Sequence, residues 1–184
     1  MWKTLRYSVY VLLFIGTTMG ATIDTQPTTP YLLVMGTAQD AGFPQAGCQK
    51  NCCRPVWEGK KNREWVSCLA YVDPTSKRAW LFDATPDFKD QLHYLQYELG
   101  LELAGIFLTH AHIGHYTGLM HLGREAMGAK NVPVYTMPAM YEYLSTNGPW
   151  SQLVALDNIA LHRIDADSLL QVADGFSVQA LPVP

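Results

Sequence analysis

Three of the six histidines in this chain lie within six residues, at positions 110, 112 and 115. The apolar residues just before them, 105–108, have the pattern of a strand. Alternate residues of an extended segment share a face, which places His110 and His112 side by side, with His115 across the turn that follows. Neutral imidazole is the commonest protein metal ligand. The sequence therefore predicts a metal site formed by His110, His112 and His115.

Length and composition are those of an ordinary soluble domain. The chain has 184 residues, of which 48% are hydrophobic and 16% are charged, enough to bury a sizeable core in one domain. Its formal net charge of -3 argues against a nucleic-acid partner, because phosphate backbones are normally met by an excess of Lys and Arg. We expect a small-molecule substrate and leave the oligomeric state open.

The first twenty residues differ in kind from the rest. Lys3 and Arg6 precede an apolar stretch at 9–16, which ends in small and polar residues. This pattern predicts a secretory signal peptide over residues 1–20, a flexible leader over 21–30 and a single domain over 31–184. The alternative is an uncleaved N-terminal anchor. A cleaved signal implies a periplasmic or secreted protein without further membrane contact, because no other segment is apolar enough to span a bilayer.

Three of the four cysteines, Cys48, Cys52 and Cys53, also lie close together, while Cys68 lies in an apolar, strand-like run. In an oxidising compartment Cys68 could form a disulfide with a member of the cluster. Three neighbouring thiols are also part of the donor set of a tetrahedral zinc site that takes one further ligand from elsewhere. We favour zinc at Cys48, Cys52 and Cys53, and a buried apolar role for Cys68.

The rest of the chain alternates predicted strands and helices. Helices are expected at 86–99, from about 119 to 128 and at 138–144, each marked by apolar spacing or by a proline or glycine at an end. The last three predicted strands, 153–156, 159–164 and 176–183, are assigned to a second sheet. Because the last of them runs to the end of the sequence, we expect a copy of the domain that is shortened at its C-terminus. The earlier strands are expected at 31–36, 67–72, 79–82, 105–108 and 132–136.

The segment Leu-Thr-His-Ala-His-Ile-Gly-His-Tyr-Thr-Gly-Leu, residues 108–119, resembles the metal-binding motif of the metallo-β-lactamase fold, which is usually His-x-His-x-Asp-His. The segments 36–45, 80–87 and 147–150 resemble the branch of that superfamily related to pyrroloquinoline quinone biosynthesis protein B. This resemblance covers nearly all of residues 31–184. It implies an α/β (α+β) architecture, an αββα sandwich of two mixed sheets with helices outside.

The resemblance also implies a zinc-dependent hydrolase with one or two catalytic ions. In that pattern His110 and His112 bind a first zinc and His115 binds a second metal, while the cysteine cluster holds a structural zinc. A metal-bound water then attacks an ester, amide or phosphoester. No catalytic residue beyond the metal ligands is assigned, and no organic cofactor is expected.

Two departures from the pattern leave other functions open. Gly114 stands where the family usually has Asp, so we expect a second metal site that is weak or built differently. A third histidine for the first zinc is expected beyond Pro184, His162 being a weak candidate inside the chain. The alternatives are an iron-dependent hydroxylase or oxygenase of cofactor biosynthesis, since imidazole also suits iron, or a non-catalytic metal-binding or carrier domain. The roles of Asp40, Asp83 and Asp87 stay open between a turn or helix-start role and metal or proton chemistry.

Overall fold

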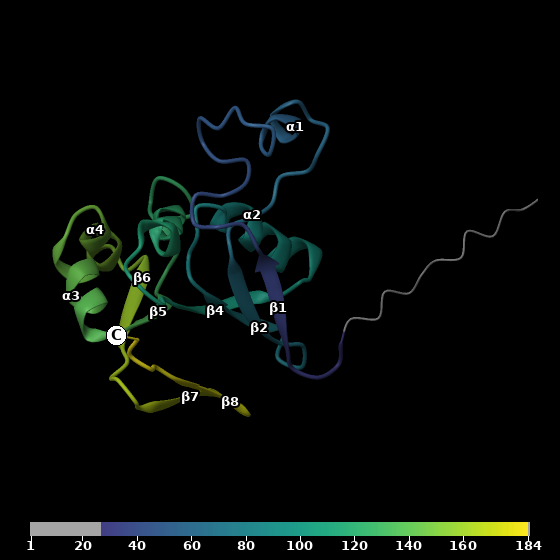
Figure 1. Cartoon of the computed structure of the whole chain (residues 1–184). Coiled ribbons are helices and arrows are strands. Elements are labelled where there is room, and N and C mark those ends of the chain that lie inside the picture. Colours follow the sequence, from purple (N-terminus) through teal and green to yellow (C-terminus); the bar gives the residue numbers. More distant parts are fainter. Residues whose placement is uncertain (1–26, 184) are drawn as a thin grey trace, which may run out of the picture.

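The computed structural model describes residues 27–183 (Figure 1). The predicted signal peptide, 1–20, and residues 21–26 of the predicted leader lie outside this range. Within the described part of the chain, no helix is both long enough and apolar enough to cross a membrane.

A six-stranded sheet forms the centre of the molecule, with its strands in the order β1-β2-β3-β4-β5-β6. The first three strands pair antiparallel, and β3 to β6 pair parallel. The parallel strands end at the same edge, which is where open α/β sheets usually place their ligand sites. The strands are β1 (Tyr31–Gly36), β2 (Cys68–Asp73), β3 (Arg78–Phe82), β4 (Glu102–Phe107), β5 (Val132–Thr136) and β6 (Ile159–Arg163).

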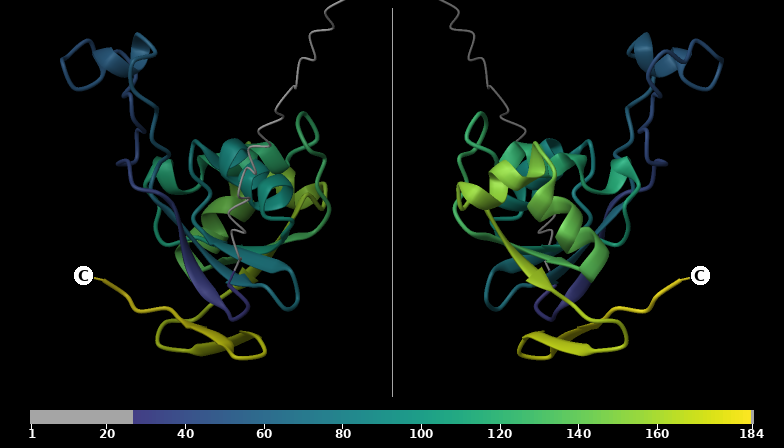
Figure 2. Two further views of the ribbon diagram at one scale, coloured as in Figure 1. Left: turned by 90° about the vertical axis from the view of Figure 1, so that its right-hand side faces the viewer. Right: turned by 90° about the vertical axis from the view of Figure 1, so that its left-hand side faces the viewer.

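Most of the helices lie on one face of this sheet, and a small hairpin lies on the other (Figure 2). The predicted helix 86–99 is present as α2 followed by a π-helical segment, η1, which together carry the buried Phe88, Leu92 and Leu95. The helical elements on this side are α2 (Phe88–His93), η1 (Tyr94–Glu98), the 3-10 segments η2 (Ile113–His115) and η3 (Thr117–Leu122), α3 (Pro138–Thr146) and α4 (Trp150–Ala155).

The main core lies between the sheet and these helices. Leu81, Ile106 and Val134 point from three adjacent strands, and Phe88 and Leu122 meet them from the helical layer, all fully buried. Burying each such side chain contributes roughly 1.5–3 kcal/mol. This packing fixes the ends of β3 and β4, the strands that lead into the histidine turn.

A second, aromatic cluster lies on the opposite face of the sheet. The hairpin of β7 (Leu169–Ala173) and β8 (Phe176–Gln179) brings Phe176 against Trp80 and Phe107. Phe176 also stacks on Tyr71, with ring centroids 3.8 Å apart. In the described residues, this two-stranded hairpin is the second sheet.

Four expectations for the elements were wrong. The strand expected at 176–183 ends at Gln179, as β8. Residues 153–155 belong to α4 and Leu156 caps its C-terminal end, because Trp150 and Leu153, three positions apart, bury one helical face. A short apolar run does not distinguish a helix from a strand. Residues 159–163 form β6, which pairs with β5 in the first sheet rather than entering a second one. The helix expected to reach Gly128 ends as η3 at Leu122, because Gly123 adopts an extended backbone conformation.

The segment between β1 and β2 forms a separate lobe that carries the short helix α1 (Arg54–Trp57) and projects from the sheet (Figures 1 and 2). Two isolated bridges, Ala38 with Val66 and Phe43 with Glu64, hold the two arms of the lobe together. The lobe carries the three clustered cysteines.

Candidate metal centre

The histidine turn begins where β4 ends, in the middle of the parallel part of the sheet. Leu108 continues the strand pairing for one residue, because its N–H donates to the carbonyl of Tyr135 at 3.0 Å. His110 and His112 lie in the segment between β4 and η2, and His115 is the last residue of η2. Asp83 follows β3 at the neighbouring strand end, so the two parallel strands deliver an acid and the histidines to one edge.

Asp83 lies on the buried side of the histidine turn and forms hydrogen bonds with two of its residues, Thr109 and His115. It is 6% exposed, and its Oδ1 accepts hydrogen bonds from the N–H of Thr109 at 2.8 Å and from its Oγ1 at 2.9 Å. Its Oδ2 lies 2.7 Å from Nδ1 of His115. A carboxylate on one ring nitrogen fixes the orientation of a histidine and directs the other nitrogen outwards, the usual arrangement behind a metal ligand.

The three histidines predicted from the sequence lie together. Nε2 of His110 is 3.0 Å from Nδ1 of His112, and the rings of His110 and His115 have centroids 4.0 Å apart. Two nitrogens bound to one zinc ion at about 2.0–2.1 Å would lie roughly 3–3.5 Å from each other. The distance between the nitrogens of His110 and His112 therefore fits a divalent ion bound by this pair.

The surroundings of His110 favour its neutral, metal-binding form. Partial burial, followed by the charges of the neighbouring His115 and His112 rings, lowers the pKa of His110 below its ordinary value. Its Nδ1 lies 2.9 Å from the hydroxyl of Thr109, which also contacts Asp83. Thr109 thus links the buried acid to the exposed histidine.

Asp40, in the loop that follows β1, is the second carboxylate at this edge. Its Oδ1 lies 3.1 Å from Nε2 of His115, and its Oδ2 lies 3.9 Å from Nδ1 of His112. The two sides of the His115 ring therefore face two different acids. His162 is exposed in β6 and stacks on Tyr135, with centroids 5.0 Å apart, rather than on the His110 group.

The cysteine cluster is compact. The sulfurs of Cys48 and Cys52 are 3.9 Å apart, those of Cys52 and Cys53 are 3.8 Å apart, and all three lie within 4.8 Å of one another. Sulfurs bound to one tetrahedral zinc at about 2.3 Å would be roughly 3.8 Å apart. This donor set fits zinc, and within residues 27–183 the group comprises these three ligands alone.

The geometry around these sulfurs differs from that of a disulfide. All four cysteines are free, and Cys68 is buried in β2, where its thiol donates to the carbonyl of Asp83 at 3.7 Å. Hydrogen bonds from the Cys53 thiol and then from the backbone of Lys50 lower the pKa of Cys48. The disulfide considered between Cys68 and the cluster is absent here.

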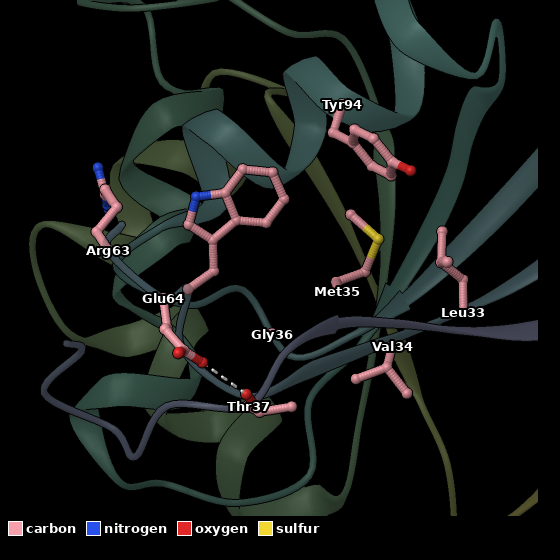
Figure 3. Close-up of a pocket in the computed structure, with 9 residues that line it drawn as sticks. Leu33, Val34, Met35, Gly36, Thr37, Arg63, Glu64 and Tyr94 are labelled. Atoms are coloured by element: carbon pink, nitrogen blue, oxygen red, sulfur yellow. Dashed lines mark hydrogen bonds between the residues drawn. The ribbon is translucent and has the colours of Figure 1, made fainter. Parts of the chain in front are cut away.

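Two cavities of the described structure are lined by residues other than the three histidines. One of about 420 Å³ lies along β1, between Leu33 and Met35 on the strand and Tyr94 on η1, with a hydrogen bond of 3.2 Å from Thr37 to Glu64 at its rim (Figure 3). Another, of about 520 Å³, lies next to the sulfurs of the lobe and includes Gln39. The histidine centre is instead open to solvent, since the side chain of His112 is 77% exposed.

The comparison with protein-family models assigns the chain to a superfamily. The family model described as the Beta-lactamase superfamily domain matches residues 78–184, more than half of the chain, so the chain belongs to this superfamily. The match begins at β3 and includes Asp83 and the histidine turn.

Within the superfamily the chain is similar to Coenzyme PQQ synthesis protein B. It is 30% identical to that protein from Acinetobacter baylyi over 163 residues, which is 82% of this chain and 52% of the relative. Its fold is similar to that of Zn(2+)-bound PqqB from Methylobacterium extorquens, with a TM-score of 0.69 and 24% identity over 83% of this chain and 56% of the other.

A diphosphatase from the PhnP family also shares the fold, with a TM-score of 0.54 and 22% identity over 77% of this chain and 52% of the other. The chain thus spans about half the length of the relatives that it matches.

Proposed function

We propose that this protein is a metal-dependent hydrolase that binds zinc at His110, His112 and His115. The observation that carries the proposal is the meeting of three imidazoles at the end of β4, with two ring nitrogens 3.0 Å apart and His115 held by the buried Asp83. A turn built only for stability would not need exposed imidazoles held this close, because each ring costs side-chain entropy to fix.

When bound, the ion supplies a water of lowered pKa and an electrophile that polarises the substrate. The protein's part is to hold the ligands in place. Asp83 directs Nε2 of His115 away from the core, and Thr109 contacts both Asp83 and His110, so that their positions are coupled. The exposure of His112 leaves room for a substrate to approach.

The proposed substrate is a small molecule with an ester, amide or phosphoester bond, without a nucleic-acid partner. The net charge of -3 supports the exclusion of a phosphate backbone. We also propose that the protein is exported, on the basis of the signal-like residues 1–20 alone.

For the lobe we propose a structural zinc on Cys48, Cys52 and Cys53. The sulfur spacings of 3.8 Å and 3.9 Å support it. A metal there would tie α1 to the loop before it, where Nε1 of Trp57 already donates to the carbonyl of Cys48 at 3.0 Å. Such a site contributes to folding free energy rather than to chemistry.

A second candidate is suggested by the name of the relatives, Coenzyme PQQ synthesis protein B. An oxygen-dependent iron hydroxylase of cofactor biosynthesis would use the same imidazoles, because these ligands suit iron as well as zinc. The identity of the metal separates the two candidates.

The test combines elemental analysis with assays on panels of esters, amides and phosphodiesters. The hydrolase proposal expects zinc in the protein as purified and turnover that is lost in the double variant His110→Ala/His112→Ala. His162→Ala is the matched control, since its ring lies outside the centre. Iron with oxygen-dependent turnover would favour the hydroxylase, and bound metal without any turnover would favour a carrier.

A further inference from the structure

Gly114 lies directly against the loop that follows β1. A Cβ atom added at position 114 would lie 2.7 Å from the Cβ of Asp40 and 2.7 Å from its carbonyl oxygen. Atoms do not approach this closely, and one of the two is backbone, so the loop could not stay where it is with any side chain at 114. The present position of Asp40 therefore requires a glycine at position 114.

This close packing brings the carboxylate of Asp40 among the histidines. Its Oδ1 lies 3.1 Å from Nε2 of His115 and its Oδ2 lies 3.9 Å from Nδ1 of His112. The side chain of Asp40 is 47% exposed, whereas that of His115 is 12% exposed. The acid thus covers the outer side of a nearly buried ring while staying within reach of an ion from solvent.

The orientation of the His115 ring determines which of its two nitrogens faces Asp40. Its Nδ1 faces Asp83 at 2.7 Å. Its Nε2, on the other side of the ring, faces the carboxylate of Asp40 at 3.1 Å. A nitrogen and an oxygen that bind one ion at about 2.0–2.2 Å lie roughly 3–3.5 Å apart, so this separation fits a shared divalent ion.

We propose that Asp40 is a metal ligand, and that its carboxylate and Nε2 of His115 hold one divalent ion beside the pair His110 and His112. The proposal rests on the proposed function, since it takes the histidine turn to bind metal. The carboxylate that is missing from the turn at Gly114 is supplied from a loop 75 residues away in sequence from His115. The second metal position then has its carboxylate ligand from Asp40 instead of from position 114.

The test is a cobalt titration of the purified, metal-free protein, followed by absorption spectroscopy. Cobalt replaces zinc at both kinds of site, and thiolate charge-transfer bands report the cysteine lobe. The visible bands report the nitrogen and oxygen centre after the contribution of the cysteine lobe, measured in His110→Ala/His112→Ala, has been subtracted. Asp40→Asn removes the charge and keeps the size of the side chain. Gly114→Ala removes no donor atom but cannot coexist with the present position of Asp40.

We expect Asp40→Asn to weaken the cobalt binding seen in the visible bands by about tenfold or more, as loss of a ligand or of its support commonly does. Gly114→Ala should weaken it in the same direction, and the control Gln39→Ala, in the same loop, should leave it unchanged. In Asp40→Asn and Gln39→Ala the thiolate bands and the melting temperature of the metal-free protein should match the wild type, which separates ligation from folding. In Gly114→Ala the thiolate bands should be kept, while the melting temperature should fall because the loop that carries Asp40 has to move.

Unchanged visible bands and affinity in Asp40→Asn would overturn the assignment of Asp40, even if the histidines bind metal. The variant His110→Ala/His112→Ala is measured alongside. If that variant also kept the visible bands of the wild type, the proposed function itself would fail, and the two failures are thereby told apart.

Discussion

Asp83 and His115 join the ends of two parallel strands, with Oδ2 of Asp83 2.7 Å from Nδ1 of His115. The acid follows β3 and the histidine closes the turn after β4, so the contact links 32 residues of sequence across the edge of the sheet. Asp83 has a positive φ of 76°, a conformation that is uncommon outside glycine and is held here by its hydrogen bonds to Thr109. The contact between Asp83 and His115 orients the His115 ring in the proposed metal centre.

The first prediction concerns this contact. Asp83→Asn should lower metal affinity at the histidines by about 10–100-fold, because the partner that orients a ligating histidine matters nearly as much as the ligand. The variant should retain the thiolate bands of the cysteine lobe. Isothermal titration with zinc measures the change in affinity. An affinity equal to that of the wild type would contradict the role of Asp83 in orienting His115.

A second prediction concerns the lobe. Cys48→Ser and Cys52→Ser should each lose about one bound zinc ion and lower the melting temperature, because a structural zinc contributes directly to folding free energy. Metal at the histidines should be retained. Cys68→Ala is the control, since its thiol lies in β2 outside the cluster, and it should keep the full zinc content. Equal zinc content in all three variants would contradict a zinc site in the lobe.

A third prediction concerns the packing beneath the turn. A Cβ at Gly118 would lie 2.3 Å from the carbonyl oxygen of Thr85 and 2.5 Å from the Cβ of Phe88. Gly118→Ala should therefore destabilise the fold by about 1–3 kcal/mol or more, the usual cost of overpacking. Denaturant unfolding measures this, with Gly148→Ala as the control because a Cβ there meets no atom within 4 Å. Similar stability in the two variants would show that η3 does not pack as described.

A fourth prediction concerns pH and the turn between β2 and β3. Hydrogen bonds from the hydroxyl of Ser76, then from the N–H groups of Thr75 and Ser76, lower the pKa of Asp73 below its ordinary value. A lowered folded pKa means that the stabilisation is present above the unfolded pKa and is lost as the pH falls through the folded one. Asp73→Ala should therefore melt below the wild type at pH 7. The gap between the two melting temperatures should close in acid, and a gap that stays constant would contradict this role.

Local patterns in the sequence were enough to predict much of the fold. The strand Tyr31–Gly36, the hairpin of β2 and β3 and the helix that begins near Pro86 are present, because each has its own apolar period and its own turn or cap residues. Residues 153–156 were assigned wrongly because four apolar residues are compatible with either type of element. The placement of β6 beside β5 depends on the path of the chain through α3 and α4 and not on the strand itself.

The site was predictable where its residues are neighbours in sequence. His110, His112 and His115 lie in one turn, and Cys48, Cys52 and Cys53 lie in one loop. The positions of Asp83 and Asp40 could not be read in the same way, because they reach His115 across 32 and 75 residues. An acid at the end of the strand next to the histidine strand was the available signal for Asp83. For Asp40 the signal was weaker still, a glycine where a motif usually has a side chain.

The central claim is that the histidines around position 112 bind a divalent ion. The most direct measurement is the zinc content of the purified protein and of His110→Ala/His112→Ala, determined by elemental analysis after dialysis against metal-free buffer. The account predicts that the variant loses zinc relative to the wild type while keeping the portion bound by the cysteine lobe. Equal zinc content in the two proteins, with both folded, would contradict it.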